Sequence, residues 1–345
     1  MKPVSGANIS QGQPIADRGL ASPEPAASGP ISLSGSTADR SHDPTIARPP
    51  PRRPVWLSWP LLALLALIVV LPSLIDIYIS FLRVNASTIG HWATAPFAGI
   101  ANYSSALTTE TVTASSALQA LWSSVSFACL ATIITTPFGF AIALAVHNRF
   151  AYRSFFRSIF LIPYVVPTVV TAIGARLAFA NGTGLVDRII GALHIGSANT
   201  YWLIGPRAFW AMLFTEVWAV WPFIYIMTLA GLSALDTDLL EAAVVDGAGY
   251  VGKLRHVVMP QVGGVLLLAM LLATIFHLGN FTLPFVMFGQ APPANVSVLP
   301  LDIYFRAFGE FAYSLAAATA VLMVLVLAIP AYVYLRMTKL DAPNA

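Results

Sequence analysis

The chain contains very little cysteine and very little charge. Its 345 residues include a single cysteine, Cys129, which lies inside an apolar run, so disulfides within the chain and cysteine-rich metal sites are excluded. Only 10% of the residues are charged, 57% are hydrophobic, and the mean hydropathy is +0.75. These values exclude a soluble globular protein. The net charge of +3 comes from dispersed basic residues, which does not indicate a nucleic-acid partner.

Two kinds of catalytic motif are also missing. Lysine occurs only as Lys2, Lys253 and Lys339, and no G-x-x-x-x-G-K-[ST] phosphate loop is found. No H-E-x-x-H motif or comparable His/Asp/Glu cluster occurs in the apolar runs, which argues against an intramembrane enzyme. We therefore expect no catalytic residues, no bound metal and no ATPase site in this chain.

Long apolar runs are present from residue 55 to residue 340. They reach the length of about 20 residues that a helix needs to cross a bilayer. They are continuous rather than alternating, which favours helices over barrel strands. The expected spans are about 56–82, 117–146, 156–180, 208–232, 262–288 and 311–335. The sequence thus predicts an all-α, polytopic membrane protein with six transmembrane helices.

Five prolines lie well inside the second to fifth of these runs: Pro137, Pro163, Pro167, Pro222 and Pro284. We expect them to kink or locally unwind the helices. Residues 1–54, in contrast, are rich in Ser, Pro, Gly and Ala and show no apolar period. This composition predicts a disordered tail. The tail is too long for the n-region of a secretory signal, and the apolar run after it is too long for an h-region.

Basic residues predict the orientation of the chain, because cytoplasmic loops carry an excess of Lys and Arg. They flank the first span, fill the loops between spans two and three and between spans four and five, and follow the last span. These residues are Arg48, Arg52, Arg53, Arg149, Arg153, Arg157, Lys253, Arg255, Arg336 and Lys339. The opposite loops hold only Arg83, Arg188, Arg207 and Arg306. Both termini and segment 236–260 are therefore predicted to be cytoplasmic.

Segment 236–260 has the signals of a short helix that ends in a sharp turn. Asp236, Thr237 or Asp238 can cap its start, and Asp238 with Glu241 has the spacing of a capping box. An apolar stripe at helical spacing follows, and Gly247 then allows the turn. Such a helix either packs on its own protein or seats in a groove of a partner.

The residues of this segment form a recognisable pattern. Glu241-Ala242-Ala243, Gly247 and the closing Val257-x-Met259-Pro260 resemble the EAA loop of binding-protein-dependent ABC importers. The stretches "PFAGIANY" (96–103), "LIPYVVPTVV" (161–170), "GTGLVDRIIG" (182–191) and "EVWAVWPFIYIMTLAGLSALDTDLLEAAVVDGA" (216–248) are similar to segments of sugar permeases of the maltose/maltodextrin and glycerol-phosphate type. The resemblance covers about residues 57–337 and implies the permease fold of a type I ABC importer.

The resemblance also implies how such a chain is driven. The EAA helices of the family sit in a cleft of a separate ATPase subunit, which uses ATP and Mg²⁺ and transmits its closure to the permease. The implied coupling residues are Glu241, Ala242, Ala243, Asp246, Gly247 and Pro260, where Asp246 either braces the turn or touches the partner. The other implied partners are a second ATPase copy, a second homologous permease and an extracytoplasmic substrate-binding protein. The implied location is the cytoplasmic membrane of a bacterium.

Sugar contacts of the maltose-type relatives carry over to positions in spans four and five. They fall on Ala219, Val220, Phe223, Ala273, Phe276, His277 and Asn280. Phe276, His277 and Asn280 follow one another at i, i+1 and i+4, so we expect one polar and aromatic patch. The resemblance implies that Phe276 stacks on a sugar ring while His277 and Asn280 bond its hydroxyls. The alternative is that these residues only pack or join helices, as Glu216 is expected to do.

Three functions stay open at this point. The first is import of a sugar, a di- or oligosaccharide, by an ATP-driven complex. The second is import by a complex of the same kind of a glycerol phosphate, which would call for cationic groups at the site, or of a polyol. The third is an ion-coupled secondary transporter working alone, for which only Glu216 and His277 offer ionisable groups near mid-membrane.

Overall fold

The computed structural model describes residues 59–340 except 114, 149 and 198. The tail expected over residues 1–54 and the first residues of the first span lie outside this part. The described part is built from helices, and its one extended pairing is an isolated antiparallel bridge between Leu82 and Phe97. This confirms the all-α fold class.

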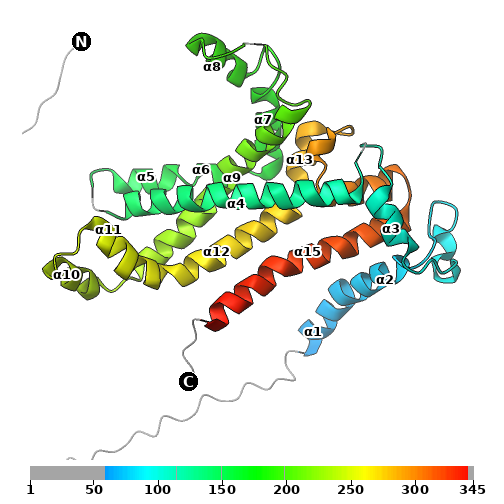
Figure 1. The fold of residues 1–345 in the computed structure, drawn as a ribbon, viewed down its shortest axis with the longest axis horizontal. Helices are drawn as coiled ribbons and strands as arrows, with labels where there is room; N and C mark the ends of the chain where they lie inside the picture. The colour runs from blue at the N-terminus through cyan, green and yellow to red at the C-terminus, as the bar shows by residue number, and fades with distance from the viewer. Residues whose placement is uncertain (1–58, 114, 149, 198, 341–345) are drawn as a thin grey trace, which may run out of the picture. The chain divides into compact units, whose positions relative to one another are not determined.

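Five helical stretches are long and apolar enough to cross a membrane (Figure 1). They are Trp59–Ile79 (α1 Trp59–Leu65, η2 Ala66–Val70, α2 Leu71–Ile79), α4 (Ala117–His147), α9 (Pro206–Ser233), Tyr250–Gly279 (α11 Tyr250–Lys253, η4 Leu254–Val258, α12 Met259–Gly279) and α15 (Tyr313–Leu340). A bent pair, Arg153–Val165 with Thr168–Ala178, makes up to six. Shorter elements connect them: η3 (Ile89–Thr94), α3 (Ala101–Thr108), α8 (Leu185–Leu193), α10 (Thr237–Val245), α13 (Thr282–Phe288), η5 (Ala294–Val296), α14 (Leu299–Tyr304) and η6 (Phe305–Gly309).

The third expected span, 156–180, is not one straight helix. It consists of α5 (Arg153–Ile159), α6 (Ile162–Val165) and α7 (Thr168–Ala178), and its two halves meet at 88°. Val166 is extended, with φ −69° and ψ 126°, because a residue that precedes proline is disfavoured in the helical region. Pro167 therefore breaks the span, whereas Pro137 and Pro222 lie inside helices that stay continuous.

The fifth expected span, 262–288, also differs from one uninterrupted helix. The helix begins at Tyr250 and ends at Gly279, and the backbone of Asn280 is non-helical with ψ 101°. The side-chain Oδ1 of Asn280 then accepts a hydrogen bond of 3.1 Å from the N–H of Leu283 in the first turn of α13. Pro284 lies in that same turn, where a missing N–H costs nothing. Pro284 lies four residues after Asn280, so in a continuous helix its ring would clash with the Asn280 carbonyl and it has no N–H to donate to that carbonyl. The proline and the hydrogen bond that Asn280 accepts therefore both account for the break.

Helices α4, α9 and α12 pack on one another and form the centre of the described part. Small residues allow α4 and α9 to approach closely, as is common between membrane helices. At Gly139, a Cβ atom would lie only 2.7 Å from the carbonyl oxygen of Trp221. The first spanning helix, Trp59–Ile79, does not pack in this way, because none of the residues in its most apolar 18-residue stretch is buried. Its surface is left to the bilayer or to another chain.

A hydrogen-bonded loop joins α7 to α9. The N–H of Gly182 donates to Oδ2 of Asp187 at 2.7 Å, and this bond holds the pKa of the Asp187 carboxyl below its usual range, although burial acts in the opposite direction. The N–H of Thr200 and the Nε1–H of Trp202 add to the effect at 3.0 Å and 2.7 Å. The ionised carboxylate thereby fixes the path of the chain around α8.

A fully buried ion pair holds α14 and η6 against α3. Nε of Arg306 donates to Oδ2 of Asp302 at 2.6 Å, and its Nη2 donates to the carbonyl oxygens of Ala106 at 3.1 Å and Thr109 at 3.0 Å. In the sequence, Arg306 counts only as one of the few basic residues in the loops predicted to be non-cytoplasmic. The structure shows that it has a structural role.

We predict that Arg306→Met lowers the free energy of unfolding by about 3–5 kcal/mol, because Asp302 is left as a buried charge without its partner. The measurement is thermal unfolding of the full chain in detergent. The double variant Asp302→Leu/Arg306→Met removes both charges and should recover most of the loss. A single variant as stable as the unchanged chain would contradict the assignment.

Candidate functional site

A cavity of about 310 Å³ lies where the two broken helices meet α9. One wall is the bend between α6 and α7, a second is the break between α12 and α13, and the third is the middle of α9. The residues lining it are Pro163, Tyr164, Val166, Thr168, Thr171, Glu216, Ala219, Val220, Phe276, Asn280, Thr282 and Leu283. Non-helical backbone at membrane depth is tolerated where it lines a cavity, and both breaks do so.

Four of the seven residues singled out in the sequence line this cavity: Ala219, Val220, Phe276 and Asn280. Phe223 lies beside it and makes an edge contact with Phe276, with ring centroids 5.7 Å apart. Ala273 is buried in the packing between α9 and α12 and does not reach the cavity. The structure therefore brings together most of the residues expected from positions about 60 apart in the chain.

His277 is placed differently from its two expected neighbours. Its ring is buried, and its Nδ1 lies 2.7 Å from Oε1 of Glu216. Its other face meets Phe127 edge-on at 6.4 Å. Positions i and i+1 point about 100° apart around a helix, so His277 turns toward α9 while Phe276 faces the cavity. The expected three-residue patch is thus divided between cavity and helix packing.

Glu216 links the two groups. Its Oε1 contacts His277, and its Oε2 accepts a hydrogen bond of 2.7 Å from Nδ2 of Asn280. The carboxylate is buried yet also lines the cavity. Asn280 uses its other side-chain atom to cap α13, so one amide joins the carboxylate to the helix break. Glu216 therefore does what was expected of it, joining helices, and in addition contributes an acidic group to the cavity wall.

Polar groups that sequence reasoning missed come mostly from the bend. Tyr164 stacks near Phe223, with centroids 6.1 Å apart, and Thr168 and Thr171 begin α7 just beyond Pro167. Oγ1 of Thr171 is buried without a hydrogen-bond partner in the described part. The sequence did offer a signal for these residues, namely threonines that follow a proline inside an apolar run. Such a proline interrupts the helix, and polar side chains next to the interruption can line a cavity.

The segment 236–260 folds as a short helix, a turn and the start of α12. Asp236 caps α10, and its Oδ1 accepts a hydrogen bond of 2.9 Å from the N–H of Asp238. Asp238 is therefore inside the helix, and it does not form the N-cap of the capping box that its spacing to Glu241 suggested. The helix begins two residues earlier because Asp236 is already in position to accept that bond.

The turn after α10 depends on Gly247. The N–H of Ala248 donates to the carbonyl of Ala243 at 2.9 Å, and the N–H of Gly247 donates to that of Val244 at 3.0 Å. This is the pairing of a Schellman motif, which needs a left-handed residue at Gly247. Its φ is +77°, and nothing lies within 4 Å of the place a Cβ would take. Conformation, not space, therefore requires glycine here.

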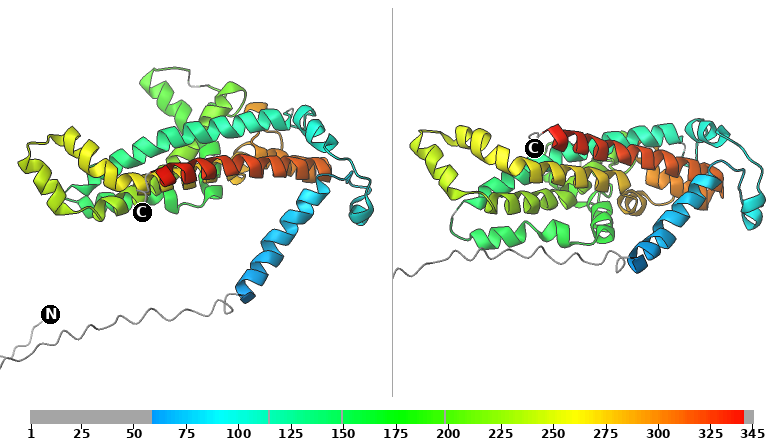
Figure 2. Two further views of the ribbon diagram at one scale, coloured as in Figure 1. Left: turned by 60° about the horizontal axis from the view of Figure 1, so that its bottom comes forward. Right: turned by 90° about the horizontal axis from the view of Figure 1, so that it is seen from below.

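The remaining coupling candidates lie on the outside of this segment. Glu241, Ala242 and Asp246 are exposed, Ala243 is half-buried, and Pro260 is exposed in the first turn of α12. Val245 has 86% of its surface exposed, which is unusual for a valine outside the apolar spans. Figure 2 shows α10 and α11 extending past the ends of the neighbouring helices. The segment therefore presents a mixed apolar and acidic surface to whatever lies beyond it.

One helix connects this segment to the cavity. It runs without interruption for 30 residues from Tyr250 to Gly279, and it includes the π-helical turn Leu254–Val258. Its near end adjoins the Gly247 turn and its far end adjoins Asn280. The coupling candidates thus lie near one end of the helix Tyr250–Gly279, and the cavity lies near its other end.

The family relationship is carried by the sequence. Residues 135–339 match the family model of the "Binding-protein-dependent transport system inner membrane component". The chain is 29% identical to the trehalose/maltose transport system permease protein of Thermococcus litoralis, over 81% of this chain and 91% of that protein. It is 28% identical to the sulfoquinovosyl glycerol transport system permease protein of Agrobacterium fabrum, over 83% of this chain and 90% of that one.

Solved structures show the same fold. A chain from the crystal structure of a bacterial ABC transporter involved in import of the acidic polysaccharide alginate superposes with a TM-score of 0.69. The match covers 84% of this chain and 98% of that chain at 17% identity. A chain of the MetNI methionine ABC transporter matches with a TM-score of 0.52 over 66% of this chain.

We predict that Glu216→Ala destabilises the protein by about 1–3 kcal/mol, because the buried Nδ1 of His277 and the Nδ2 of Asn280 lose their acceptor. Glu216→Gln keeps one oxygen and should lose less. Thermal unfolding of the full chain in detergent compares the two. If Glu216→Ala unfolds at the temperature of the unchanged chain, the carboxylate does not hold the helix break in place.

Proposed function

Because the chain belongs to the family of binding-protein-dependent transport system inner membrane components, we propose that it is the permease subunit through which an ATP-driven importer moves a sugar across the cytoplasmic membrane. The observation that carries the proposal is the cavity between the two helix breaks. There the ring of Phe276 stands beside the amide of Asn280, the carboxylate of Glu216 and the hydroxyls of Thr168 and Thr171.

This combination suits a neutral, hydroxyl-rich solute. A few convergent polar groups on an otherwise apolar wall orient a ligand, and an aromatic face can cover the apolar face of a sugar ring. Both carboxylate and amide oxygens accept hydrogen bonds from hydroxyls, while the amide and threonine hydroxyls also donate. The relative named for trehalose and maltose transport supports a neutral sugar.

The charge of the cavity argues against a glycerol phosphate. Glu216 is the only carboxylic acid among its lining residues, and none of them is Lys, Arg or His. An anionic phosphate brought next to a carboxylate of low solvent exposure would be repelled. A polyol meets no such obstacle and remains compatible with the same groups.

The driving force is proposed to come from other chains. Segment 236–260 would seat in an ATPase subunit, one of a pair that binds ATP and Mg²⁺, with Glu241 as the polar anchor and Gly247 as the turn. Under this arrangement the segment and both termini face the cytoplasm, as the distribution of Lys and Arg indicates. A second, homologous permease would face the cavity across the bundle, and an extracytoplasmic binding protein would deliver the solute.

We predict that Phe276→Ala raises the KM for sugar uptake about tenfold, since an aromatic contact contributes about 0.5–1.5 kcal/mol beyond its buried area. The measurement is uptake of labelled disaccharides by proteoliposomes that contain the complete complex. Phe155→Ala is the matched control, because Phe155 is an exposed phenylalanine on α5 outside the cavity. Equal KM values for both variants would remove Phe276 from the solute site. Uptake driven by an ion gradient without ATP would overturn the importer assignment.

We predict that Gly247→Ala lowers binding-protein-stimulated ATP hydrolysis several-fold while the chain stays folded, because a side chain at φ +77° costs about 1–2 kcal/mol and distorts the turn. Gly249→Ala is the control, since Gly249 has φ −66° and open space around it. The ratio of solute imported to ATP hydrolysed is measured for each. Unchanged coupling in Gly247→Ala would argue that the turn plays no part in transmission.

A further inference from the structure

A groove made of two adjoining hollows runs along α9, on a different side of that helix from the cavity. Its first part, of about 620 Å³, lies at the beginnings of both helices. Gln119, Ser123 and Ser126 of α4 line it together with Asn295 from the loop that contains η5. Nδ2 of Asn295 donates to the carbonyl of Gly205 at 3.1 Å, which ties this loop to the start of α9. Trp122, Leu130, Phe209 and Trp210 line it as well, so this end of the groove is built from three segments and is mixed in polarity, with more polar groups than the second part.

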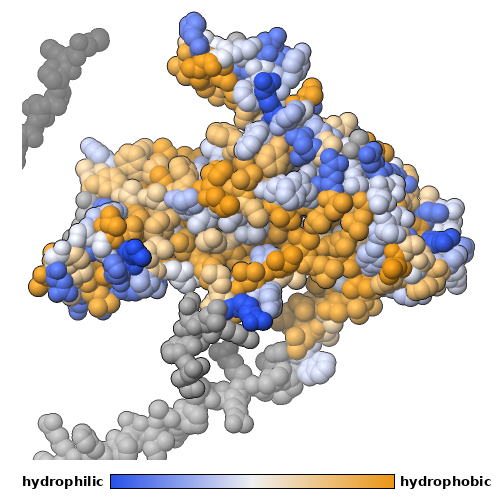
Figure 3. Space-filling view, in the orientation of Figure 1, coloured by the Kyte–Doolittle hydropathy of each residue, from blue (hydrophilic) through white to orange (hydrophobic). Residues whose placement is uncertain are grey.

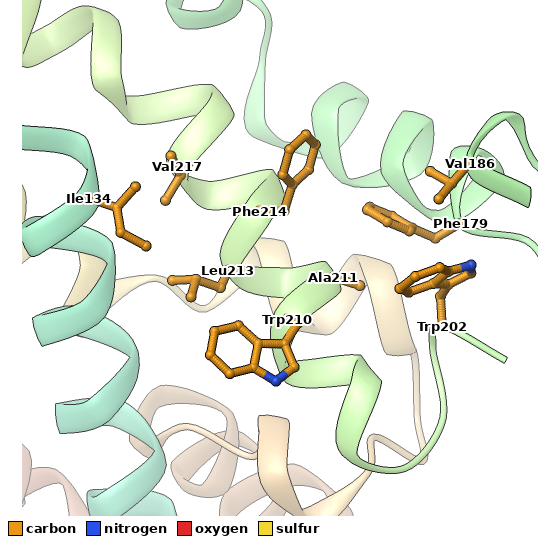
Figure 4. A pocket seen from close by; sticks show the side chains of 9 residues that line it. All are labelled: Ile134, Phe179, Val186, Trp202, Trp210, Ala211, Leu213, Phe214 and Val217. Atoms are coloured by element: carbon orange, nitrogen blue, oxygen red, sulfur yellow. The ribbon is translucent and has the colours of Figure 1, made fainter. Parts of the chain in front are cut away.

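The second part of the groove is apolar. It has a volume of about 450 Å³ and lies over α9 between α4 and the segment around α8 (Figure 4). Its lining residues are Ile134 of α4, Trp210, Ala211, Leu213, Phe214 and Val217 of α9, and Phe179, Val186 and Trp202. None of its lining side chains is charged. Phe214 and Glu216 lie two residues apart in one helix, and their side chains thus point about 200° apart. The groove and the solute cavity therefore lie on different sides of α9, and the directions of their lining side chains come nearest to each other at Leu213 and Val220, which are seven residues apart.

Trp210 joins the two parts, because it lines both. Gln119, Ser123, Ser126, Leu130 and Ile134 of α4 follow at intervals of three or four residues, so they form one stripe along the helix. The stripe changes from polar to apolar along its length. In the space-filling view, apolar side chains are spread widely over this bundle (Figure 3), as expected of a surface in contact with lipid.

The length of the groove matches one leaflet of a bilayer. From Gln119 to Ile134 the helix advances 15 residues, or about 22 Å. A bilayer with its headgroups is about 40–45 Å thick, so one leaflet spans about 20–22 Å. A tryptophan at the change from polar to apolar lining is also what the membrane interface favours. The groove has the dimensions and the polarity gradient of one lipid molecule.

A cation is available at the polar end. Arg207 is exposed in the first turn of α9, and although it does not itself line the groove, it directly follows Pro206, which does. Within residues 59–340 the structure pairs it with no carboxylate. A guanidinium is well suited to a phosphate, and N–H groups in the first turn of a helix also favour an anion.

We propose that this groove binds a single glycerophospholipid, with one acyl chain along Ile134, Phe214 and Val217 and its phosphate beside Arg207. The orientation given above assigns the lipid to the outer leaflet. The site itself depends on neither the solute nor the ATPase, so it stands or falls separately from the proposed function.

The test uses the assembled transporter in nanodiscs that contain phosphatidylglycerol with a photoactivatable group in one acyl chain. After irradiation, labelled peptides are identified by mass spectrometry. We expect labelling concentrated on residues 130–134 and 210–217 of the unchanged chain. Ile134→Trp fills the apolar end and should lower this labelling at least about fivefold, which corresponds to a loss of about 1 kcal/mol in binding. Ile133→Trp, at a neighbouring exposed position outside the groove, should leave it unchanged.

The headgroup is tested with a second pair of variants. Arg207→Gln should reduce the labelling by phosphatidylglycerol about threefold or more through loss of the phosphate contact, whereas Arg188→Gln, an exposed arginine on α8, should not. Equal labelling of all exposed apolar faces would overturn the proposal in favour of ordinary solvation by the bilayer. Labelling of the isolated chain that disappears in the assembled complex would overturn it too, because a protein partner then covers the groove.

Discussion

Backbone groups at membrane depth need hydrogen-bond partners inside the protein, and this constraint governs the arrangement of the described helices. Two of the spanning segments are interrupted, one at Val166–Pro167 and the other at Asn280. In hydrocarbon, such breaks survive only where they are buried or line a cavity. The structure meets the constraint by placing both breaks against the same stretch of α9. The cavity is thus a direct outcome of two helices that cannot continue.

Glu216 makes this arrangement specific. A buried carboxylate is costly unless its oxygens are bonded, and here one oxygen contacts His277 while the other accepts from Asn280. Because Asn280 also caps α13, the same network that satisfies the carboxylate sets the direction in which the chain leaves α12. Helix packing and the proposed solute site therefore share residues. A change of specificity at this site has to preserve the bonds that hold the break open.

Much of this was accessible from the sequence, and the reasons for the remainder are physical. Continuous apolar runs imply helices, and the glycine at position 247 marks a turn whose backbone only glycine adopts easily. Pro167 signalled the break in the third span and Pro284, four residues after Asn280, the break in the fifth, whereas the hydrogen bond that Asn280 accepts from α13 could not be read from the sequence. The partnership of Glu216 with His277 joins residues 61 positions apart, and the pair Asp302–Arg306 is anchored by carbonyls about 200 positions away. Tertiary contacts of this kind leave no local pattern.

The unbroken helix from Tyr250 to Gly279 sets the scale of motion that the fold can transmit. A rod of 30 residues is about 45 Å long, so a tilt of only about 5° at one end displaces the other by about 4 Å. Such a displacement is comparable to the width of a single side chain at the wall beside Asn280. The π-helical turn Leu254–Val258 lies at the end of this helix near the Gly247 turn. The part of the helix that reaches the cavity is regular α-helix, so it can tilt without bending there.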